Sequence, residues 1–234
     1  MKIKSTKDIG KDLGIKCLVY GCSGVGKTTL CATAPKPLIL AAENGLLSIK
    51  EHALPYVSIN SLVELSQVLD ELVGIGDEYE TICLDSISEV VDHCLFGVEN
   101  KLRSRDARHV YPEVRSMILR IMKKLISLPQ HIIVTCKEQH KEIDHQKTIA
   151  CPSVAGTRLS DDMAYMFDLV FYYRFVNSQR IIFPNANEKF IAKDRSNLLT
   201  RPFAPAKNCF VTLINKLKGE VTDGKESQVA GVSD

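Results

Sequence analysis

The sequence predicts an α/β fold: a mostly parallel central sheet with helices on both faces and an antiparallel edge near the C-terminus. Short apolar runs rich in Ile, Val and Leu alternate with longer segments of helical periodicity, the pattern of a parallel sheet covered on both faces. Turn-forming residues separate the last strand-like segments, which indicates an antiparallel meander. The 234 residues are 45% hydrophobic and 25% charged, so disordered and fibrous classes are excluded and one large domain is expected.

Four early segments have the character of strands buried on both faces, because each is short and apolar. They are residues 15–20, 37–41, 81–84 and 131–136. Between them, apolar residues recur with a period of about 3.6 residues. This period predicts helices over residues 62–72, 87–102 and 114–125.

Beyond residue 159 the pattern changes to strand-like segments. Residues 168–175, 180–183 and 188–193 are separated by turn residues at Asn177-Ser178 and at 184–187, which predicts a meander at the sheet edge. Residues 219–234 are polar, without apolar periodicity, and are expected to form a solvated tail. The expected organisation is an N-terminal extension over residues 1–14, a core over 15–218 and a flexible tail over 219–234.

The chain shows no sequence feature of a membrane or secreted protein. Its apolar runs are far shorter than the ~20 residues that span a bilayer, and residues 1–16 carry five lysines without a following apolar stretch. The eight cysteines include no Cys-x-x-Cys pair, which favours a reducing compartment and a cytoplasmic location. Two thiols and two imidazoles between residues 136 and 151 have the chemistry of zinc ligands, but their spacing fits no compact zinc motif. They are Cys136, His140, His145 and Cys151.

The strongest motif lies between the first predicted strand and a helix. Residues 21–28 match G-x-x-x-x-G-K-[ST] at every fixed position, which predicts a loop whose backbone N–H groups surround a polyphosphate. Lys27 would neutralise the β- and γ-phosphates of ATP, and the Thr28 hydroxyl would bind Mg²⁺. The predicted nucleotide-binding residues are Gly21, Cys22, Ser23, Gly24, Val25, Gly26, Lys27, Thr28 and Thr29.

Two carboxylates follow predicted strands and should reach the same edge of the sheet as this loop. Asp85 ends the apolar run 81–84 and is expected to hold Mg²⁺ through water, as a Walker B acid does. Glu43 follows the run 37–41, where a carboxylate orients and deprotonates a water that attacks the γ-phosphate. Together with Lys27, Glu43 is the predicted catalytic residue of an ATPase.

Glu43, the strand end Leu84-Asp85-Ser86 and the late Ala192-Lys193-Asp194-Arg195 resemble the recombinase core of the RecA family. The segment LVYGCSGVGKTTLCATAPKPLIL is similar, more closely, to short phage-encoded RecA-like ATPases, single-strand annealing proteins that contain little more than that core. The resemblance covers about residues 15–205. It implies a RecA-like P-loop NTPase fold. It also implies Mg-ATP-dependent binding of single-stranded DNA, with annealing or strand exchange in phage homologous recombination, in the host cytoplasm.

The resemblance also implies roles for residues outside the loop. Lys193 and Arg195 match two basic residues that reach the γ-phosphate of a neighbouring subunit, as an arginine finger does. Glu138 falls near the polar residue that senses the γ-phosphate, although that residue is usually not acidic in the long recombinases. A homo-oligomer, either a filament or a ring, is therefore expected. A single-stranded-DNA-binding protein is a further candidate partner.

The basic residues of the chain are concentrated in one segment. Residues 101–124 hold eight basic and two acidic residues in a chain of net charge +2, which is the expected electrostatic footprint of DNA binding. In the resemblance this segment is the first DNA-facing loop, and residues 137–158 are the second, a loosely patterned loop that would order on binding. The candidate contacts are Arg103, Arg105, Arg108, Tyr111, Lys137, Lys141, Lys147 and Arg158.

Two other functions remain open from sequence. A P-loop kinase acting on a nucleoside or nucleotide would use the same loop and Mg²⁺ acid, with the basic segment as a lid. An annealing protein without turnover would use ATP only as an assembly ligand. A GTPase is disfavoured, because Asp85-Ser86-Ile87-Ser88 is not D-x-x-G.

Overall fold

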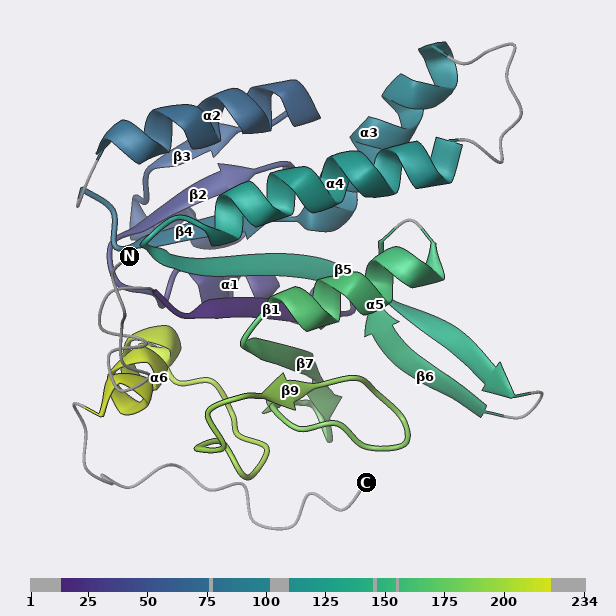
Figure 1. Ribbon diagram of the computed structural model, residues 1–234. Coiled ribbons are helices and arrows are strands. Elements are labelled where there is room, and N and C mark those ends of the chain that lie inside the picture. The colour runs from purple at the N-terminus through teal and green to yellow at the C-terminus, as the bar shows by residue number, and fades with distance from the viewer. Residues whose placement is uncertain (1–13, 76–77, 102–109, 145–146, 155, 220–234) are drawn as a thin grey trace, which may run out of the picture.

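A sheet lies at the centre of the protein between two layers of helices (Figure 1). The computed structural model describes residues 14–75, 78–101, 110–144, 147–154 and 156–219. Its strands are β1 (Lys16–Gly21), β2 (Pro37–Ala41), β3 (Tyr56–Ser58), β4 (Thr81–Asp85), β5 (His131–Asp144), β6 (Lys147–Pro152), β7 (Leu169–Val176), β8 (Gln179–Phe183) and β9 (Lys193–Asp194). Its helices are α1 (Lys27–Cys31), the 3₁₀ helix η2 (Leu46–His52), α2 (Leu62–Ile75), α3 (Ile87–Lys101), α4 (Val110–Ile126), α5 (Thr157–Met166) and α6 (Cys209–Lys218).

The strand order confirms the predicted fold class. Within the described residues the sheet runs β3-β2-β4-β5-β1-β7-β8, and all pairs from β3 to β7 are parallel. The β8 and β9 strands pair antiparallel with β7, so the C-terminal edge is antiparallel as predicted. Because β5 lies between β1 and β4, the phosphate-binding loop and Asp85 extend from strands two positions apart at the same edge.

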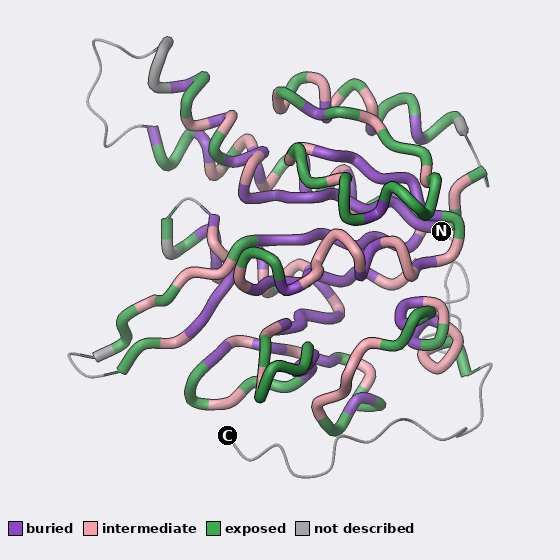
Figure 2. Tube along the Cα trace, turned by 180° about the vertical axis from the view of Figure 1, so that it is seen from behind, coloured by how far each residue is buried: buried purple, intermediate pink, exposed green. Residues whose placement is uncertain are grey.

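Two buried clusters fill the space on the two faces of the sheet. Apolar residues of α2, α3, α4 and α5 pack on one face, and those of α1 and α6 pack on the other. Strands β1, β2, β4 and β7 are buried along most of their length, whereas the edge strand β3 is largely exposed (Figure 2). Helices therefore cover both faces, as the continuous apolar strands predict. No helix in the described ranges has the length and apolar character needed to cross a membrane.

The turn between β7 and β8 lies where the sequence places it. Asn177 and Ser178 both have positive φ angles, 48° and 64°, and join the paired residues Val176 and Gln179. Two residues of positive φ form the turn that matches the twist of an antiparallel hairpin. The hairpin positions Phe175 and Arg180 directly opposite each other.

The predicted strand over residues 188–193 is wrong. The structure contains only the two-residue β9 there, preceded by a turn in which Asn187 Oδ1 accepts hydrogen bonds from the N–H groups of Lys189 and Phe190. An Asn side chain that binds the backbone two and three residues on closes a local turn, which prevents an extended ladder. The alternating pattern of the sequence does not show that the Asn187 side chain competes with strand pairing for these backbone N–H groups.

The predicted loop over residues 137–158 is also wrong. Strand β5 continues to Asp144 and pairs antiparallel with β6, from Glu138 opposite Pro152 to Asp144 opposite Lys147. Charged residues on both faces of this hairpin hide the period-2 pattern from which strands are predicted. Backbone hydrogen bonds pair the two strands nonetheless, and only the second half of β6, which includes Ala150 and Cys151, is buried.

A buried histidine at the start of β5 binds the backbone just before β1. His131 is 6% exposed, and its Nδ1 accepts a hydrogen bond from the N–H of Ile15 at 3.0 Å. Burial, together with the nearby Lys218 and Lys16, lowers the pKa of His131 to about 4, against the partial opposition of Glu80. The neutral imidazole is therefore the form that the fold holds.

We expect His131 to make stability depend on pH. Because its folded pKa lies below the unfolded value of 6.5, its contribution is complete above pH 6.5 and is lost as the pH falls toward 4. Between pH 7 and pH 5 the free energy of unfolding should fall by about 2 kcal/mol more in the native chain than in His131→Asn. Urea unfolding of both proteins at the two pH values measures this difference, and equal pH dependence would contradict it.

Candidate functional site

The phosphate-binding loop joins the end of β1 to the start of α1. Its first residue, Gly21, lies so close to β7 that a Cβ atom there would be 2.0 Å from the carbonyl oxygen of Tyr173. Gly24 and Gly26 have φ angles of 76° and 101°, a backbone conformation that side chains disfavour. All three glycines therefore meet a backbone requirement, and the loop can surround a polyphosphate with its N–H groups.

Lys27 folds back over this loop. Its Nζ donates hydrogen bonds to the carbonyl oxygens of Gly21 and Cys22, at 2.8 and 2.9 Å. Both acceptors belong to the loop itself, so the ammonium group is held over the loop. A charge in this position can neutralise phosphate oxygens bound by the loop.

Asp85, at the end of β4, is 2% exposed and accepts two side-chain hydrogen bonds. Thr28 Oγ1 donates to its Oδ2 at 2.7 Å, and Thr135 on β5 donates to its Oδ1. One carboxylate thus joins β4 to α1 and to β5. The sequence predicts Asp85 and Thr28 but not Thr135, although Thr135 is the one hydroxyl residue in the apolar run 132–136.

Thr28 and Asp85 form a donor set that fits Mg²⁺. This ion takes hard oxygen ligands in octahedral geometry at 2.0–2.1 Å, so neighbouring ligands lie about 3 Å apart. The 2.7 Å separation between Thr28 Oγ1 and Asp85 Oδ2 is of this size. When bound, Mg²⁺ would supply positive charge to the polyphosphate, while Asp85 orients the hydroxyl of Thr28.

Glu43 lies beside Asp85 at the carboxyl edge of the sheet. The N–H groups of Ala42 and Glu43 donate to the carbonyl oxygen of Asp85 at 2.7 and 3.2 Å. Ser86 Oγ donates to Glu43 Oε1 at 2.6 Å, a contact that the sequence did not predict. The structure therefore brings Glu43, Asp85 and Thr28 together, with the Glu43 carboxylate anchored at one oxygen.

Glu138 lies on the opposite face of β5 from Thr135, because side chains alternate along a strand. Its neighbours are Tyr20 and Tyr172, whose rings stack with centroids 5.0 Å apart. Burial raises the pKa of Tyr172, and the negative charge of Glu138 raises it further. Since α1 and Asp85 lie on the face of Thr135, Glu138 starts from the other face of β5, and its role as a γ-phosphate sensor stays a prediction.

Lys193 and Arg195 lie at the other end of β7 from the loop. Strand β9 pairs with the first residues of β7, whereas Gly21 contacts Tyr173 near its end. Lys193 Nζ donates to the carbonyl oxygen of Ala164 at 2.5 Å, and Arg195 forms a 3.1 Å ion pair with Asp168. These cations do not reach the phosphate-binding loop of their own chain.

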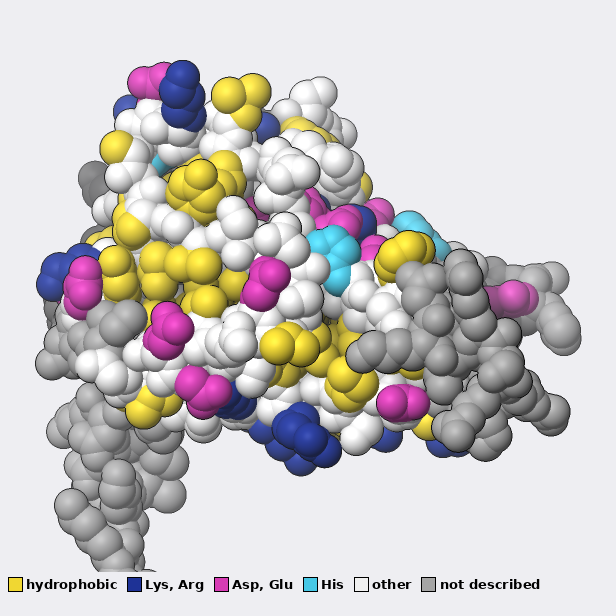
Figure 3. Space-filling view, turned by 90° about the horizontal axis from the view of Figure 1, so that it is seen from above, with side chains coloured by type: hydrophobic (Ala, Val, Ile, Leu, Met, Phe, Trp, Pro, Cys, Tyr) yellow, Lys and Arg dark blue, Asp and Glu magenta, His cyan; other side chains and the backbone are white. Residues whose placement is uncertain are grey.

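The predicted DNA contacts of the first basic segment are only partly placed. Arg103, Arg105 and Arg108 lie outside the described residues. Tyr111 is described at the start of α4 and is 53% exposed. Further along the helix, Arg120 and Lys123 are exposed as well. Lysine, arginine and acidic side chains are interspersed over the face that Figure 3 shows.

The cations of the second predicted segment are compensated by carboxylates. Three lysines of the β5–β6 hairpin form ion pairs: Lys137 with Glu89, Lys141 with Asp161 and Lys147 with Glu188. Arg158 is exposed at the start of α5. The hydrogen bond from Lys137 to Glu89 raises the pKa of Lys137, which favours its charged ammonium form.

The described members of the cysteine and histidine cluster, Cys136, His140 and Cys151, are not arranged to hold a metal ion. Cys136 and Cys151 are buried, and burial raises the pKa of the Cys136 thiol to about 12, which favours the protonated form over the thiolate that binds metals. Among the described residues no three His, Cys, Asp or Glu side chains are placed to hold a metal ion. His145 lies outside the described residues.

A glycine-rich loop between a buried strand and a helix, a lysine over that loop, and a hydroxyl and two carboxylates beside it define a P-loop ATPase. Residues 13–196 match the family described as AAA domain, and the chain belongs to this family.

Among solved structures, a prototypical ATPase from the type III secretion system of pathogenic bacteria is similar, with 15% sequence identity and a TM-score of 0.48. The match covers 83% of this chain and 62% of that one, so the chain spans less than two thirds of that protein. No curated protein matches the chain.

Replacing Thr135 by Val removes one hydrogen-bond donor from Asp85 and preserves the side-chain shape. We expect the ATPase rate to fall about tenfold, because a buried acceptor that loses its donor costs roughly 1–3 kcal/mol. The affinity for ATP should change little, since the loop is intact. Steady-state hydrolysis over a Mg²⁺ titration, with the Kd for ATP, measures both effects. Thr135→Ser retains the hydroxyl and should hydrolyse ATP near the native rate; an equal loss there would contradict the proposed contact.

Proposed function

We propose that this protein is a Mg-ATP-dependent, single-stranded DNA-binding ATPase that promotes annealing or strand exchange in phage homologous recombination. The observation that carries the ATPase part is the convergence of Lys27, Thr28, Asp85 and Glu43 at one edge of the sheet. The DNA part is supported by the excess of positive charge in residues 101–124. The resemblance to phage RecA-like ATPases connects the two.

Glu43 is the proposed base of the hydrolytic step. Its Oε1 accepts a hydrogen bond from Ser86, and its backbone N–H is bound to Asp85, so the carboxylate has a fixed position next to the Mg²⁺-binding groups. Its second oxygen, Oε2, is then the atom that accepts the proton of a water attacking the γ-phosphate. A protein that only binds nucleotide does not require such a group.

The DNA surface is proposed at the described ends of α3 and α4 and at the hairpin β5–β6, which project on the same side of the protein (Figure 1). The exposed aromatic residues Phe96 on α3 and Tyr111 on α4 can stack on bases there, at 70% and 53% exposure. The hairpin lysines are already paired with carboxylates, so we assign most of the phosphate contacts to residues 101–124.

Lys193 and Arg195 act between subunits in this proposal. Because they lie away from their own loop, they can contribute only to the nucleotide of a neighbouring chain, which requires a homo-oligomer, either a filament or a ring. Arg195 would exchange its ion pair with Asp168 for a phosphate. The proposal also includes the core over residues 15–218, a cytoplasmic location and a single-stranded-DNA-binding protein as partner.

Glu43→Gln tests whether turnover matters. We expect hydrolysis to fall at least about a hundredfold, the contribution of a general base, and the complex with ATP and single-stranded DNA to become long-lived. Lys27→Ala should abolish ATP-dependent DNA binding, since it removes the cation from the loop. Hydrolysis assays and dissociation of fluorescent oligonucleotides measure these effects.

The exposed Glu51→Gln serves as the matched control and should resemble the native protein. DNA complexes of unchanged lifetime in Glu43→Gln would favour an annealing protein without turnover. Phosphoryl transfer to a nucleoside, without stimulation by DNA, would favour the kinase. DNA binding that still depends on ATP in Lys27→Ala contradicts the proposal altogether.

Salt dependence tests the basic segment. For single strands the slope of log K against log salt is about −0.7 per phosphate contact, so Arg103→Gln with Arg105→Gln should make the slope shallower by about 1.4. DNA-stimulated hydrolysis should fall in parallel. The control is Arg201→Gln with Lys218→Gln, two exposed cations outside α3, α4 and the β5–β6 hairpin, whose replacement removes the same charge. Equal effects of the two pairs would show a net-charge effect and no local site.

A further inference from the structure

Lys137 lies directly beside the phosphate-binding loop. It is the last residue of β5 that pairs with β1, and its partner there is Gly21, the first residue of the loop. Paired strands are about 5 Å apart, so the loop begins next to the backbone of Lys137. Thr135, two residues earlier, binds Asp85, and side chains two residues apart on a strand share a face. Lys137 therefore starts from the face of the sheet that carries the nucleotide site.

Two hydrogen bonds fix the backbone of Lys137 in this position. Its N–H donates to Ser88 Oγ at 2.9 Å, and its carbonyl oxygen accepts from the N–H of Ser153 at 2.7 Å. Ser88 is buried in the first turn of α3 and also donates to the carbonyl oxygen of Ser153 at 2.8 Å. The side chain of Lys137, by contrast, is 45% exposed. Its ammonium group, on a flexible four-carbon stem, can therefore change partner while the backbone stays in place.

The ammonium group of Lys137 lies among carboxylates of the site and of α3. It donates to Glu89 Oε1 in the first turn of α3, and it is 3.9 Å from a carboxylate oxygen of Asp92. The hydrogen bond to Glu89 raises the pKa of Lys137 against partial burial, and the negative charge of Glu43 raises it further. Glu43 is the proposed base for the water that attacks the γ-phosphate. Its influence places the Lys137 ammonium group toward the γ-phosphate end of the site.

The ion pair between Lys137 and Glu89 is of a kind that a phosphate can replace. Both side chains are partly exposed, and such pairs are weak because water screens them. A phosphate group carries more negative charge than a carboxylate and offers three strong acceptor oxygens. A γ-phosphate next to Lys137 would therefore compete with Glu89 for the same ammonium group.

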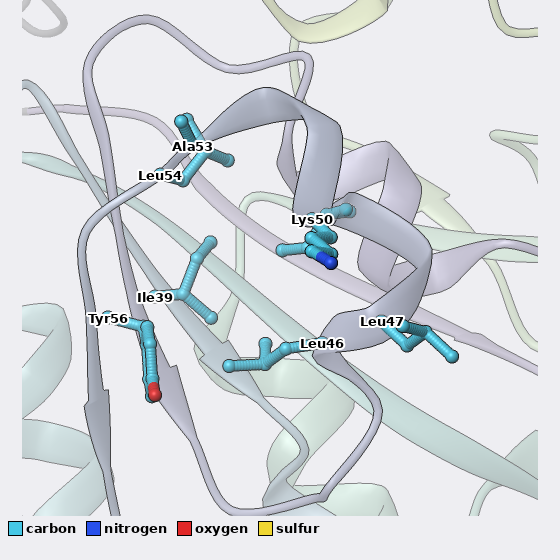
Figure 4. A pocket seen from close by; sticks show the side chains of 8 residues that line it. Ile39, Leu46, Leu47, Lys50, Ala53, Leu54 and Tyr56 are labelled. Carbon is cyan, nitrogen blue, oxygen red and sulfur yellow. The ribbon is translucent and has the colours of Figure 1, made fainter.

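A lysine in η2 is placed differently. Lys50 borders an apolar hollow of about 360 Å³ between β2, η2 and β3, where aliphatic side chains such as Leu46 and Leu54 surround it (Figure 4). Among the described residues that line this hollow, none belongs to the phosphate-binding loop. Lys50 therefore lacks the position beside the phosphates that the strand register gives to Lys137.

We propose that Lys137 contacts the γ-phosphate of bound ATP, and that Glu89 holds the same ammonium group when the γ-phosphate is absent. Lys137 thereby determines the preference for ATP over ADP, and Glu89, as the competing partner, limits it. Because Glu89 belongs to α3, the exchange makes one contact of that helix depend on the nucleotide. This inference rests on the proposed nucleotide site and adds to it a pair of residues that determines its specificity.

Two nucleotides that differ in the γ-phosphate test the contact. We expect Lys137→Gln to weaken the binding of β,γ-imido-ATP, which is not hydrolysed, about tenfold, the effect of losing one charge-assisted hydrogen bond. ADP binding should be unchanged, which also shows that the variant is folded. Isothermal titration calorimetry on the full chain with Mg²⁺ measures both Kd values. DNA is left out, so the outcome is independent of the proposed DNA function.

Glu89→Gln should have the opposite effect. We expect β,γ-imido-ATP to bind about threefold more tightly, because the competing partner of Lys137 is removed, and ADP to bind as before. In the double variant the substitution of Glu89 should have no further effect, since the ammonium group for which it competes is absent. A mere loss of negative charge near the site would instead tighten both nucleotides, with or without Lys137.

An ion pair at the opposite edge of the sheet supplies the matched control. Lys36 and Glu80 lie just before β2 and β4, with 2.7 Å between the ammonium nitrogen and the carboxylate oxygen. Lys36→Gln and Glu80→Gln remove the same charges and should change neither affinity.

Three results would overturn the inference. They are equal weakening of both nucleotides by Lys137→Gln, no weakening of β,γ-imido-ATP by that variant, and an effect of Glu89→Gln that is absent or that persists without Lys137. Lys27→Ala should weaken both nucleotides, because it removes the cation held over the loop. Its failure to do so would instead contradict the nucleotide site itself.

Discussion

The buried carboxylate of Asp85 is the constraint on which the arrangement of the site depends. A charge removed from water is tolerated when hydrogen bonds satisfy it, and Asp85 has hydroxyl donors on two different elements, Thr28 on α1 and Thr135 on β5. Its carbonyl oxygen also accepts from the backbone after β2, which brings Glu43 to the same place. One residue therefore fixes the relative positions of the loop helix, β4, β5 and the end of β2.

The sequence predicts the elements whose signal is local. The apolar runs of β1, β2 and β4 can be recognised because strands buried on both faces require apolar residues. The loop motif can be recognised because its backbone conformation requires glycine. Thr135 and Ser86 were not predicted, because a hydroxyl acquires its role only when strand order brings it beside a carboxylate distant in the chain. The charged hairpin β5–β6 was predicted to be a loop for a different reason: backbone hydrogen bonds pair its strands, and they leave no periodic pattern in its charged residues.

Placement of the charged residues also depended on the tertiary structure. In the sequence, Lys137, Lys141 and Lys147 count as free positive charge, but in the fold each lies against a carboxylate from another element. Glu138 fell at the expected position along β5 and on the opposite face, since a difference of three residues from Thr135 reverses the direction of a side chain. Conversely, Arg180 belongs to no sequence motif, and only the β7–β8 hairpin places its guanidinium group beside Gly26 of the phosphate-binding loop.

The length of β5 has a mechanical consequence. A single strand, His131–Asp144, contains both Thr135, which binds Asp85 inside the sheet, and Lys141, on the projecting hairpin. Six residues of extended chain span about 20 Å without a turn between them. The hairpin is thus the outer arm of the strand that borders the nucleotide site, and a tilt of β5 imposed at either end is transmitted to the other through one continuous backbone.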